Sequence, residues 1–428
     1  MCMDMRRKIY WEQQQWGGKQ TNTRTQTRTR ARQRRIHRET RSIPLWVTRL
    51  LVTASASRSI GEIRGGESVT PIMMETMRVM CCGEILFDCF SQSGDGGEKS
   101  YDKCILGGAP QNVANHLAQI SRYISECSTC IRVTMASRVG DDELGQQALA
   151  LMNEAGIDTS FVQVTKVEGS KGSQIEEEPQ VEETGRVFVD LDDDGEANYT
   201  ILGSDDIQGK SIIAWDNIEF DQRLVNEAGQ SDVIIYGTLA CRNVVSRTTL
   251  KALSWAGARR CCDVNFRIPM PSKEVVSSSV ESCWLLKMNE YELKTLIKMF
   301  PGRVQNKDSV KDMVKGLAAS FDCQYICVTF GSEGSALWSS LDQTWTEAKS
   351  RLVYDCSDGD SVGAGDAFLA ALVYGLWRFE SISASPSPMP NLQTILEIAN
   401  SLGAFVASKS GATPKHDDPA VCKMFKEM

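Results

Sequence analysis

The run from Asp360 to Asp366 combines small residues and carboxylates in a pattern that suits phosphate chemistry. At Gly363, Ala364 and Gly365 the side chains are small enough for backbone N–H groups at a helix N-terminus to converge on an anion. Asp366 would lie beside that anion as a general base, in the first turn of the apolar helix that follows. A base next to a group of amides is what phosphoryl transfer to an alcohol requires. These residues by themselves are equally compatible with a capped helix after a glycine turn.

A second glycine-rich run extends from Gly107 to Asn112. Gly107 and Gly108 would let the backbone approach a ligand closely, and Asn112 lies where the next helix starts. Taken alone, this run is more typical of a turn followed by a helix cap than of a binding loop.

Strands and helices alternate from residue 78 onward, which predicts an α/β fold with a mainly parallel sheet covered on both faces. Apolar spacing and breaker residues predict the boundaries. Strands are expected at residues 78–87, 232–236, 260–264, 284–288 and 325–330, and helices at residues 111–122, 143–155, 244–255, 290–299, 310–321, 364–376 and 392–408.

Two segments, residues 87–107 and 184–202, interrupt this alternation and resemble antiparallel β excursions. In the second, the turn signal at residues 192–195 separates two apolar stretches, which predicts a hairpin. We expect the two segments to form a small β lid over the carboxyl edge of the sheet, where open α/β folds bind ligands. The acidic residues 168–183 between them are predicted to be a surface insertion.

Charge is distributed unevenly along the 428 residues. Residues 1–77 carry 15 Lys and Arg against 6 Asp and Glu, and residues 78–428 carry 32 against 49. The acidic body argues against nucleic-acid binding over most of the chain. We expect residues 1–77 to be a disordered basic leader or an over-extended start; the composition also allows an organelle transit peptide, and more remotely an RNA-binding arm.

Other sequence features argue against several classes of protein and of binding site. No stretch approaches the roughly 18–20 apolar residues that a membrane helix needs. The fifteen cysteines are scattered, and we expect them to be reduced and mostly buried thiols. Residues 203–211 resemble a phosphate-binding P-loop, but the glycine spacing is one residue too long and two acids lie where phosphates would bind.

Seven motifs in order give residues 78–414 a resemblance to the ribokinase-like (PfkB) carbohydrate kinases, and most closely to the fructokinases. They are Gly83–Asp88, Gly107–Asn112, Val139–Gly145, Asp263–Arg267, Asn289–Glu292, Thr329–Gly334 and Asp360–Asp366. The resemblance implies a three-layer α/β/α sandwich with a β lid, in one domain over residues 78–428. It also implies an ATP-dependent kinase that phosphorylates a monosaccharide hydroxymethyl group, most often that of D-fructose.

The resemblance also implies a role for each site residue. Asp366 would be the base, with the amides of Gly363, Ala364 and Gly365 as the anion hole. The sugar would be bound by Asp88, Gly107, Gly108, Asn112 and Arg267, and ATP by Lys287, Thr329, Gly331 and Gly334. Mg²⁺ would be held through water by Asn289 and Glu292. A monovalent cation such as K⁺ would lie at Asp360 and Ser361.

Alternatives to a fructokinase stay open at this point. Another kinase of the family would phosphorylate ribose, a ketodeoxysugar acid or a nucleoside, and a sugar acid would need a cation such as Arg186 or Arg242. A non-catalytic, fructokinase-like regulatory protein would keep the fold without turnover. We further expect a homodimer formed through the lid, located in the cytoplasm, or in a plastid or mitochondrion if the leader is a transit peptide.

Overall fold

The computed structural model describes residues 75–428 except 94–98, 125–128, 166–181, 192–196, 202–211, 303–308, 358 and 382–390. The chain divides into two units, Met1–Val69 and Thr70–Met428, and only the second contains described residues. Most of the expected leader and of the acidic insertion, and all of the hairpin turn and of the P-loop-like run, therefore lie outside the described residues.

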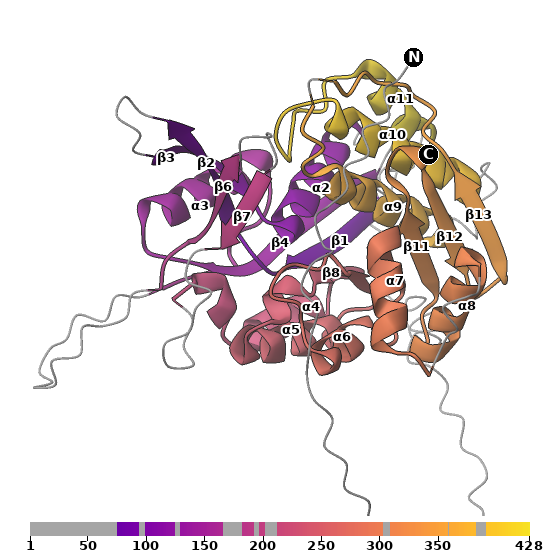
Figure 1. The fold of residues 1–428 in the computed structure, drawn as a ribbon, viewed down its shortest axis with the longest axis horizontal. Helices are drawn as coiled ribbons and strands as arrows, with labels where there is room; N and C mark the ends of the chain where they lie inside the picture. The colour runs from indigo at the N-terminus through magenta and orange to yellow at the C-terminus, as the bar shows by residue number, and fades with distance from the viewer. Residues whose placement is uncertain are drawn as a thin grey trace, which may run out of the picture. The chain divides into compact units, whose positions relative to one another are not determined.

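A nine-stranded sheet forms the centre of the second unit, in the order β13-β12-β11-β10-β9-β8-β1-β4-β5 (Figure 1). In this order, all the strands from β11 across to β5 are parallel to their neighbours, and β12 and β13 close the other edge as an antiparallel hairpin. Their bounds are β1 Glu75–Cys82, β4 Thr129–Val139, β5 Val162–Val164, β8 Val233–Gly237, β9 Arg260–Asp263, β10 Leu285–Asn289, β11 Tyr325–Thr329, β12 Ser335–Ser339 and β13 Thr344–Ala348.

Helices cover both faces of this sheet, and each face has its own buried core. One core includes α2 Ala109–Ile124, α3 Glu143–Ala155, α9 Ala364–Ser381, α10 Leu392–Ala407 and α11 Pro419–Glu427. The other includes α4 Gln222–Ala228, α5 Val244–Ala256, α6 Lys273–Val280, α7 Glu290–Met299 and α8 Val310–Phe321. This is the three-layer α/β/α architecture that the sequence predicted.

Local sequence signals explain where several helices begin and end. Asp142 caps α3 by accepting a hydrogen bond from the Gly145 amide, and Gly156 ends the helix with a φ of 85°. Both ends of α3 therefore lie where the sequence placed them. The helices α4 and α6 were not predicted, because segments of seven and eight residues are too short to show a helical period.

The first strand differs from the expectation. Residues 78–87 were predicted as one strand, but β1 ends at Cys82 and β2 begins at Leu86. Gly83 separates them with a φ of 143°, and a Cβ there would lie 2.8 Å from Pro110 Cγ. The break carries the chain from the large sheet into the lid. β1 also begins at Glu75, before the domain boundary expected after residue 77.

The lid is a four-stranded sheet in the order β3-β2-β6-β7, with bounds Lys99–Gly107, Leu86–Ser93, Gly185–Leu191 and Ala197–Ile201. β6 and β7 pair antiparallel from Leu191 opposite Ala197, which confirms the hairpin. β2 and β6 are parallel, so the two excursions meet along these strands. The two segments therefore form one four-stranded sheet.

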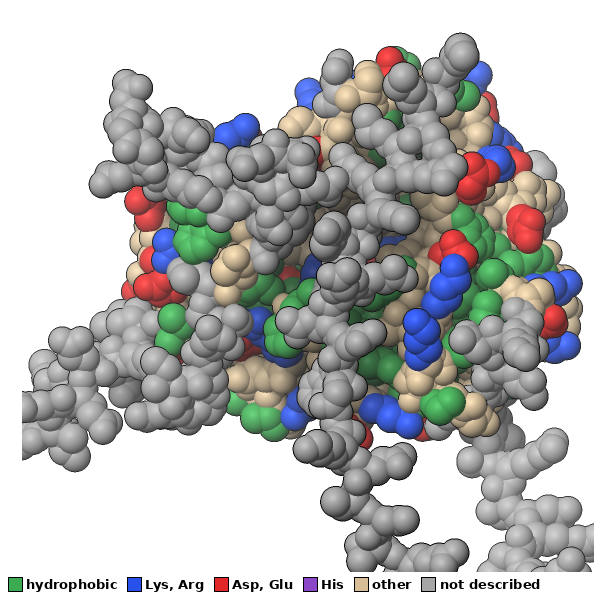
Figure 2. All heavy atoms as spheres, viewed as in Figure 1, with side chains coloured by type: hydrophobic (Ala, Val, Ile, Leu, Met, Phe, Trp, Pro, Cys, Tyr) green, Lys and Arg blue, Asp and Glu red, His purple; other side chains and the backbone are tan. Residues whose placement is uncertain are grey.

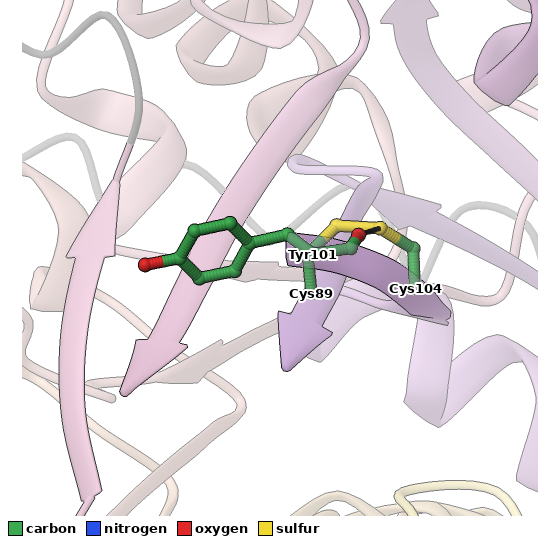
Figure 3. The surroundings of a disulfide bond; sticks show 3 residues. All are labelled: Cys89, Tyr101 and Cys104. Atoms are coloured by element: carbon green, nitrogen blue, oxygen red, sulfur yellow. Dashed lines mark hydrogen bonds between the residues drawn. A yellow bond between two sulfur atoms is a disulfide. The ribbon is translucent and has the colours of Figure 1, made fainter. Parts of the chain in front are cut away.

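The expectation that all the cysteines are reduced is wrong for two cysteines of the lid. Cys89 and Cys104 are directly opposite each other on the antiparallel strands β2 and β3 and form a disulfide (Figure 3). Sequence separation gave no hint of this pair, because strand register alone brings the two sulfur atoms together. Of the cysteines that are free in the described part of the chain, most are buried, while Cys356 is exposed.

The surface carries charges of both signs. On the face drawn in Figure 2, Lys and Arg side chains lie interspersed with Asp and Glu side chains, so its described part offers no extended basic area for nucleic acid. Among the described residues, no helix is long and apolar enough to cross a membrane.

Candidate active site

The N-terminus of α9 follows a sharp turn that brings two distant segments together. Gly363 has a φ of 74°, and a Cβ there would lie 2.2 Å from the Ala412 carbonyl oxygen. Only glycine fits this conformation and this approach. The turn leads directly into the first turn of α9, where the Ala364 amide donates a long hydrogen bond of 3.4 Å to the Ser361 carbonyl and the Asp366 amide donates to the Gly363 carbonyl at 3.0 Å. Ala364, Gly365 and Asp366 therefore start the helix where an anion would bind.

The predicted base and the predicted sugar loop touch each other. The Asn112 side-chain amide donates a hydrogen bond of 2.8 Å to Oδ2 of Asp366. Asn112 lies in the first turn of α2, directly after Gly107 and Gly108, and its backbone amide donates to the Gly108 carbonyl. Residues 254 positions apart in the sequence thus share one site.

The sugar loop packs against two acidic residues of the lid entrance. A Cβ at Gly107 would lie 2.7 Å from Oδ2 of Asp88, and one at Gly108 would lie 2.4 Å from the Glu84 carbonyl oxygen. Neither position accepts a side chain. Asp88 therefore lies directly against the loop, as predicted, and Glu84 lies beneath it.

A buried ion pair lies beside the start of α9. Lys287 on β10 donates from Nζ to Oδ2 of Asp263 on β9 at 2.7 Å, and both side chains are buried. A Cβ at Gly365 would be 3.2 Å from the Lys287 Nζ. The sequence assigned Lys287 to ATP, and the structure places its charge next to the candidate anion hole.

Burial raises the pKa of four carboxyl groups of the candidate site, those of Asp366, Asp88, Glu84 and Glu292. Burial raises the pKa of Asp366 to about 6, although Lys287 and the Asn112 hydrogen bond act in the opposite direction. Burial likewise raises the pKa of Asp88 to about 6 and that of Glu84 to about 7, with Arg267 opposing both shifts. Arg267 itself is exposed and acts electrostatically on Asp366, Asp88 and Glu84. Its contact with phosphate or sugar stays a prediction.

The two candidate metal-binding pairs already have partners within the chain. Asn289 caps α7, and both carboxylate oxygens of Glu292 accept backbone amides, from Asn289 and Phe266. The Asp360 oxygens accept the amides of Val362 and Gly411. Among the described residues, no group of three His, Cys, Asp or Glu side chains could hold a metal ion by itself.

The remaining predicted ATP residues follow the neighbouring strand. Thr329 ends β11 opposite Asn289 of β10. Gly331 and Gly334 both have positive φ, and a Cβ at Gly334 would lie 2.2 Å from the Ala348 carbonyl oxygen. Asp263, Asn289 and Thr329 therefore end adjacent parallel strands at one edge of the sheet, where α/β folds bind ligands.

Sequence reasoning gave no role to Glu84 or Asp263, although both lie inside quoted motifs. Among the described residues, Glu84 Oε2, Asp263 Oδ1 and Asn112 Oδ1 are buried and have no hydrogen-bond partner. Buried polar atoms without partners are costly, and a site lined by them suits a ligand rich in hydroxyl groups. Glu84 lies two residues after the end of β1, and Asp263 is the last residue of β9, so their positions at strand ends were the available signal.

Residues 76–419 match the family model described as pfkB family carbohydrate kinase. The chain belongs to that family. Similar curated proteins include Fructokinase-1 of Oryza sativa subsp. japonica, which is 26% identical over 72% of this chain and 84% of its own length. Fructokinase of Vibrio alginolyticus is 26% identical over 78% of this chain and 94% of its own length.

Solved structures support the same fold. The crystal structure of fructokinase with bound ATP from Xylella fastidiosa aligns with a TM-score of 0.62 at 18% identity, covering 82% of this chain and 98% of that one. Fructokinase from Vibrio cholerae O395, in a form bound to fructose, ADP and calcium ion, aligns with a TM-score of 0.58 at 21% identity, covering 83% of this chain and 99% of that one. The ribokinase-like fold that the motifs implied is therefore confirmed in this member of the pfkB family.

The pKa of Asp366 predicts an acid limit for turnover. A general base must be deprotonated, so kcat should be constant above neutral pH and fall as pH decreases through about 6. Below that value we expect a loss of about tenfold per pH unit. The measurement is kcat at saturating substrates across this range, with circular dichroism to verify that the protein stays folded. A kcat that is unchanged down to pH values well below 6 would contradict this role for Asp366.

Proposed function

We propose that this protein transfers the γ-phosphate of ATP to the 6-hydroxymethyl group of D-fructose, giving fructose 6-phosphate and ADP. The observation that carries the proposal is the hydrogen bond between Asn112 and Asp366. It joins a loop suited to sugar hydroxyls to a carboxylate at the N-terminus of α9. The curated relatives named above are fructokinases, which supports fructose as the acceptor.

The reaction follows from the positions of the side chains. Asp366 accepts the proton of the sugar hydroxyl while that oxygen forms its bond to the γ-phosphorus and the bond to the ADP oxygen breaks. The amides of Gly363, Ala364 and Gly365 stabilise the negative charge on the transferred group, and the nearby Lys287 ammonium adds to this field.

The sugar would bind between the lid and α2. Asp88, Asn112 and the backbone at Gly107 and Gly108 offer carboxylate, amide and carbonyl groups, which suit hydroxyls because each hydroxyl both donates and accepts. The unpartnered Asn112 Oδ1 supplies an acceptor at this point. Thr329, Gly331 and Gly334 would line the ATP side of the site.

Two cations complete the proposal. Glu292 has both oxygens bonded to amides, so Asn289 and Glu292 would hold Mg²⁺ through water, which suits an ion that dehydrates reluctantly. When bound, Mg²⁺ neutralises phosphate charge. Asp360 is exposed and keeps lone pairs for a monovalent cation beside Ser361, which has a φ of 56°. A homodimer through the lid stays a prediction.

The structure weakens one alternative substrate class. A ketodeoxysugar acid would need a free cation, and both candidates have carboxylate partners. Arg242 donates to Asp216 at 2.6 Å, and Arg186 donates to Glu183 at 2.5 Å. Arg242 donates to Asp216 from both Nε and Nη2 and is therefore engaged. Arg186 bonds Glu183 through Nη2 alone, and its buried Nε has no partner among the described residues, so the sugar-acid alternative is weakened for Arg242 only.

A panel of acceptors tests the proposed function. We expect fructose to give the highest kcat/KM among fructose, ribose, glucose, ketodeoxygluconate and adenosine, by at least about tenfold, since unpaired polar groups in a site discriminate strongly. The measurement is ADP release with Mg²⁺ and K⁺ present. A higher value for ribose or the sugar acid would overturn fructose but not the kinase. If no acceptor yields ADP above background, the non-catalytic alternative is favoured.

A further inference from the structure

One face of α2 holds the segment that precedes α11. His116, Gln119 and Tyr123 are three and four residues apart on the helix, so they share one face. The side-chain oxygen of Gln119 accepts the His416 amide at 2.8 Å, and its nitrogen donates to the Pro414 carbonyl at 3.2 Å. His116 and His416 are both buried, and their ring planes are nearly parallel, at 12°, with centroids 5.1 Å apart.

The two histidines form a directional chain of hydrogen bonds. His116 Nε2 lies 3.0 Å from the Ala412 carbonyl oxygen, which can only accept, so this nitrogen carries the proton. Nδ1 of the neutral His116 is then an acceptor, and His416 Nε2, 2.9 Å away, donates to it. His416 Nδ1 in turn accepts from the Tyr123 hydroxyl at 3.3 Å. With both rings neutral, every polar atom of this chain of hydrogen bonds is satisfied and no charge is buried.

Burial keeps both rings in this neutral form. It lowers the pKa of His116 to about 4 and that of His416 to about 3, and the neighbouring His116 contributes to the second shift. The titratable groups facing the pair are Tyr123 on α2 and Cys422 on α11, whose sulfur is 3.7 Å from the His416 carbonyl oxygen. No ion pair involves either ring within the described part of the chain.

The chain of hydrogen bonds ends at the candidate anion hole. The Ala412 carbonyl that accepts from His116 is the group that packs against Gly363. The next residue back, Gly411, donates its amide to Oδ2 of Asp360 at 2.8 Å. Segment 411–412 therefore contacts both ends of the turn before α9. At its other end α2 holds Asp366 through Asn112, so this one helix supports the base and the turn together.

We propose that His116 and His416 are positioning residues for phosphoryl transfer, which fix Ala412 and through it the Gly363 turn. The inference rests on the proposed kinase function. Neither residue lies in the seven motifs named above, and neither was assigned to a substrate. Because small displacements of reacting groups are costly, loosening the Ala412 carbonyl should lower kcat rather than substrate affinity.

Two matched substitutions separate positioning from packing. In His116→Gln the amide nitrogen reaches the place of Nε2 and still donates to Ala412, whereas in His116→Asn it is too short to do so. We expect the Gln variant to keep kcat within about threefold and the Asn variant to lose about 10- to 100-fold, with each KM changed by less than about twofold. Both variants should melt at lower temperature. Equal kcat in the two variants, or a loss that appears in KM instead, would overturn the proposal.

Two further measurements do not depend on turnover. The chain has three histidines, so ¹⁵N-histidine NMR of the full protein resolves the pair. We expect both rings to be neutral with the proton on Nε2 and to remain so down to about pH 5; a ring that titrates near its ordinary pKa overturns the hydrogen-bond chain. Hydrogen exchange of residues 360–367 should be faster in His116→Asn than in His116→Gln, and equal rates would overturn the coupling.

These results remain decisive if the wild-type protein phosphorylates no sugar. That outcome would refute the proposed function, while the exchange comparison would still decide whether His116 holds the Gly363 turn.

Discussion

Asp366→Asn should reduce kcat by about 10²–10⁴-fold while the protein still binds ATP and sugar. The amide has the size of the carboxylate but cannot accept the hydroxyl proton. Asp366 is also in place before substrate arrives, because Asn112 holds its Oδ2 and the N-terminus of α9 fixes its backbone. The measurement is kcat for ADP release, together with ATP and fructose affinities from calorimetry.

A matched control for this substitution is Glu154→Gln, which also converts a carboxylate to an amide, but at an exposed position on α3. It should leave kcat unchanged. If Asp366→Asn keeps more than about a tenth of the wild-type kcat, then Asp366 is not the general base.

Asp88→Ala is the second substitution with a large expected effect, and the effect should fall on the sugar. Asp88 lies against the backbone of Gly107, so its loss removes a hydrogen-bonding group and leaves a gap beside the sugar loop. We expect kcat/KM for fructose to fall by roughly 10³-fold or more, since sites built from buried hydrogen-bonding groups discriminate by up to about 10⁵. ATP affinity should change by less than about twofold.

Thr200→Ala is the control for the Asp88 experiment, because Thr200 is exposed on the lid strand β7. It should leave both substrates unaffected. A loss of ATP affinity equal to the loss of fructose use in Asp88→Ala would show instead that the substitution distorts the whole site. Retention of fructose kcat/KM would exclude Asp88 from sugar binding.

The disulfide is a contact between residues close in the sequence that was not predicted. Cys89 and Cys104 are separated by 15 positions, and no spacing rule pairs them. They meet because β2 and β3 turn back on each other with Asp88 opposite Ile105, which places the next pair of residues, Cys89 and Cys104, face to face. Strand register was the missing information, and a sequence alone does not specify it for a lid strand.

The sequence by itself determined the chemistry of the main loops and part of the order of elements, although it missed β4, β12, β13, α4, α6 and α11. Apolar spacing and caps placed α3, α7 and α8 at their observed bounds, because those signals are local. The small residues before Asp366 and the glycines before Asn112 likewise allow another group to approach the backbone closely, and this property depends only on the residue types. Both motifs therefore pointed to the candidate site before any contact between them was known.

Only the tertiary structure decided which groups meet. It brought Asn112 to Asp366, paired Lys287 with Asp263, and joined His116 to His416, 300 positions away, by a hydrogen bond. The physical reason is that a parallel sheet gathers the carboxyl ends of strands that are distant in sequence, and helix packing sets the contacts around them. The hydrogen-bonded histidine pair has no sequence signature, because it is defined by hydrogen-bond direction and burial, which exist only after folding.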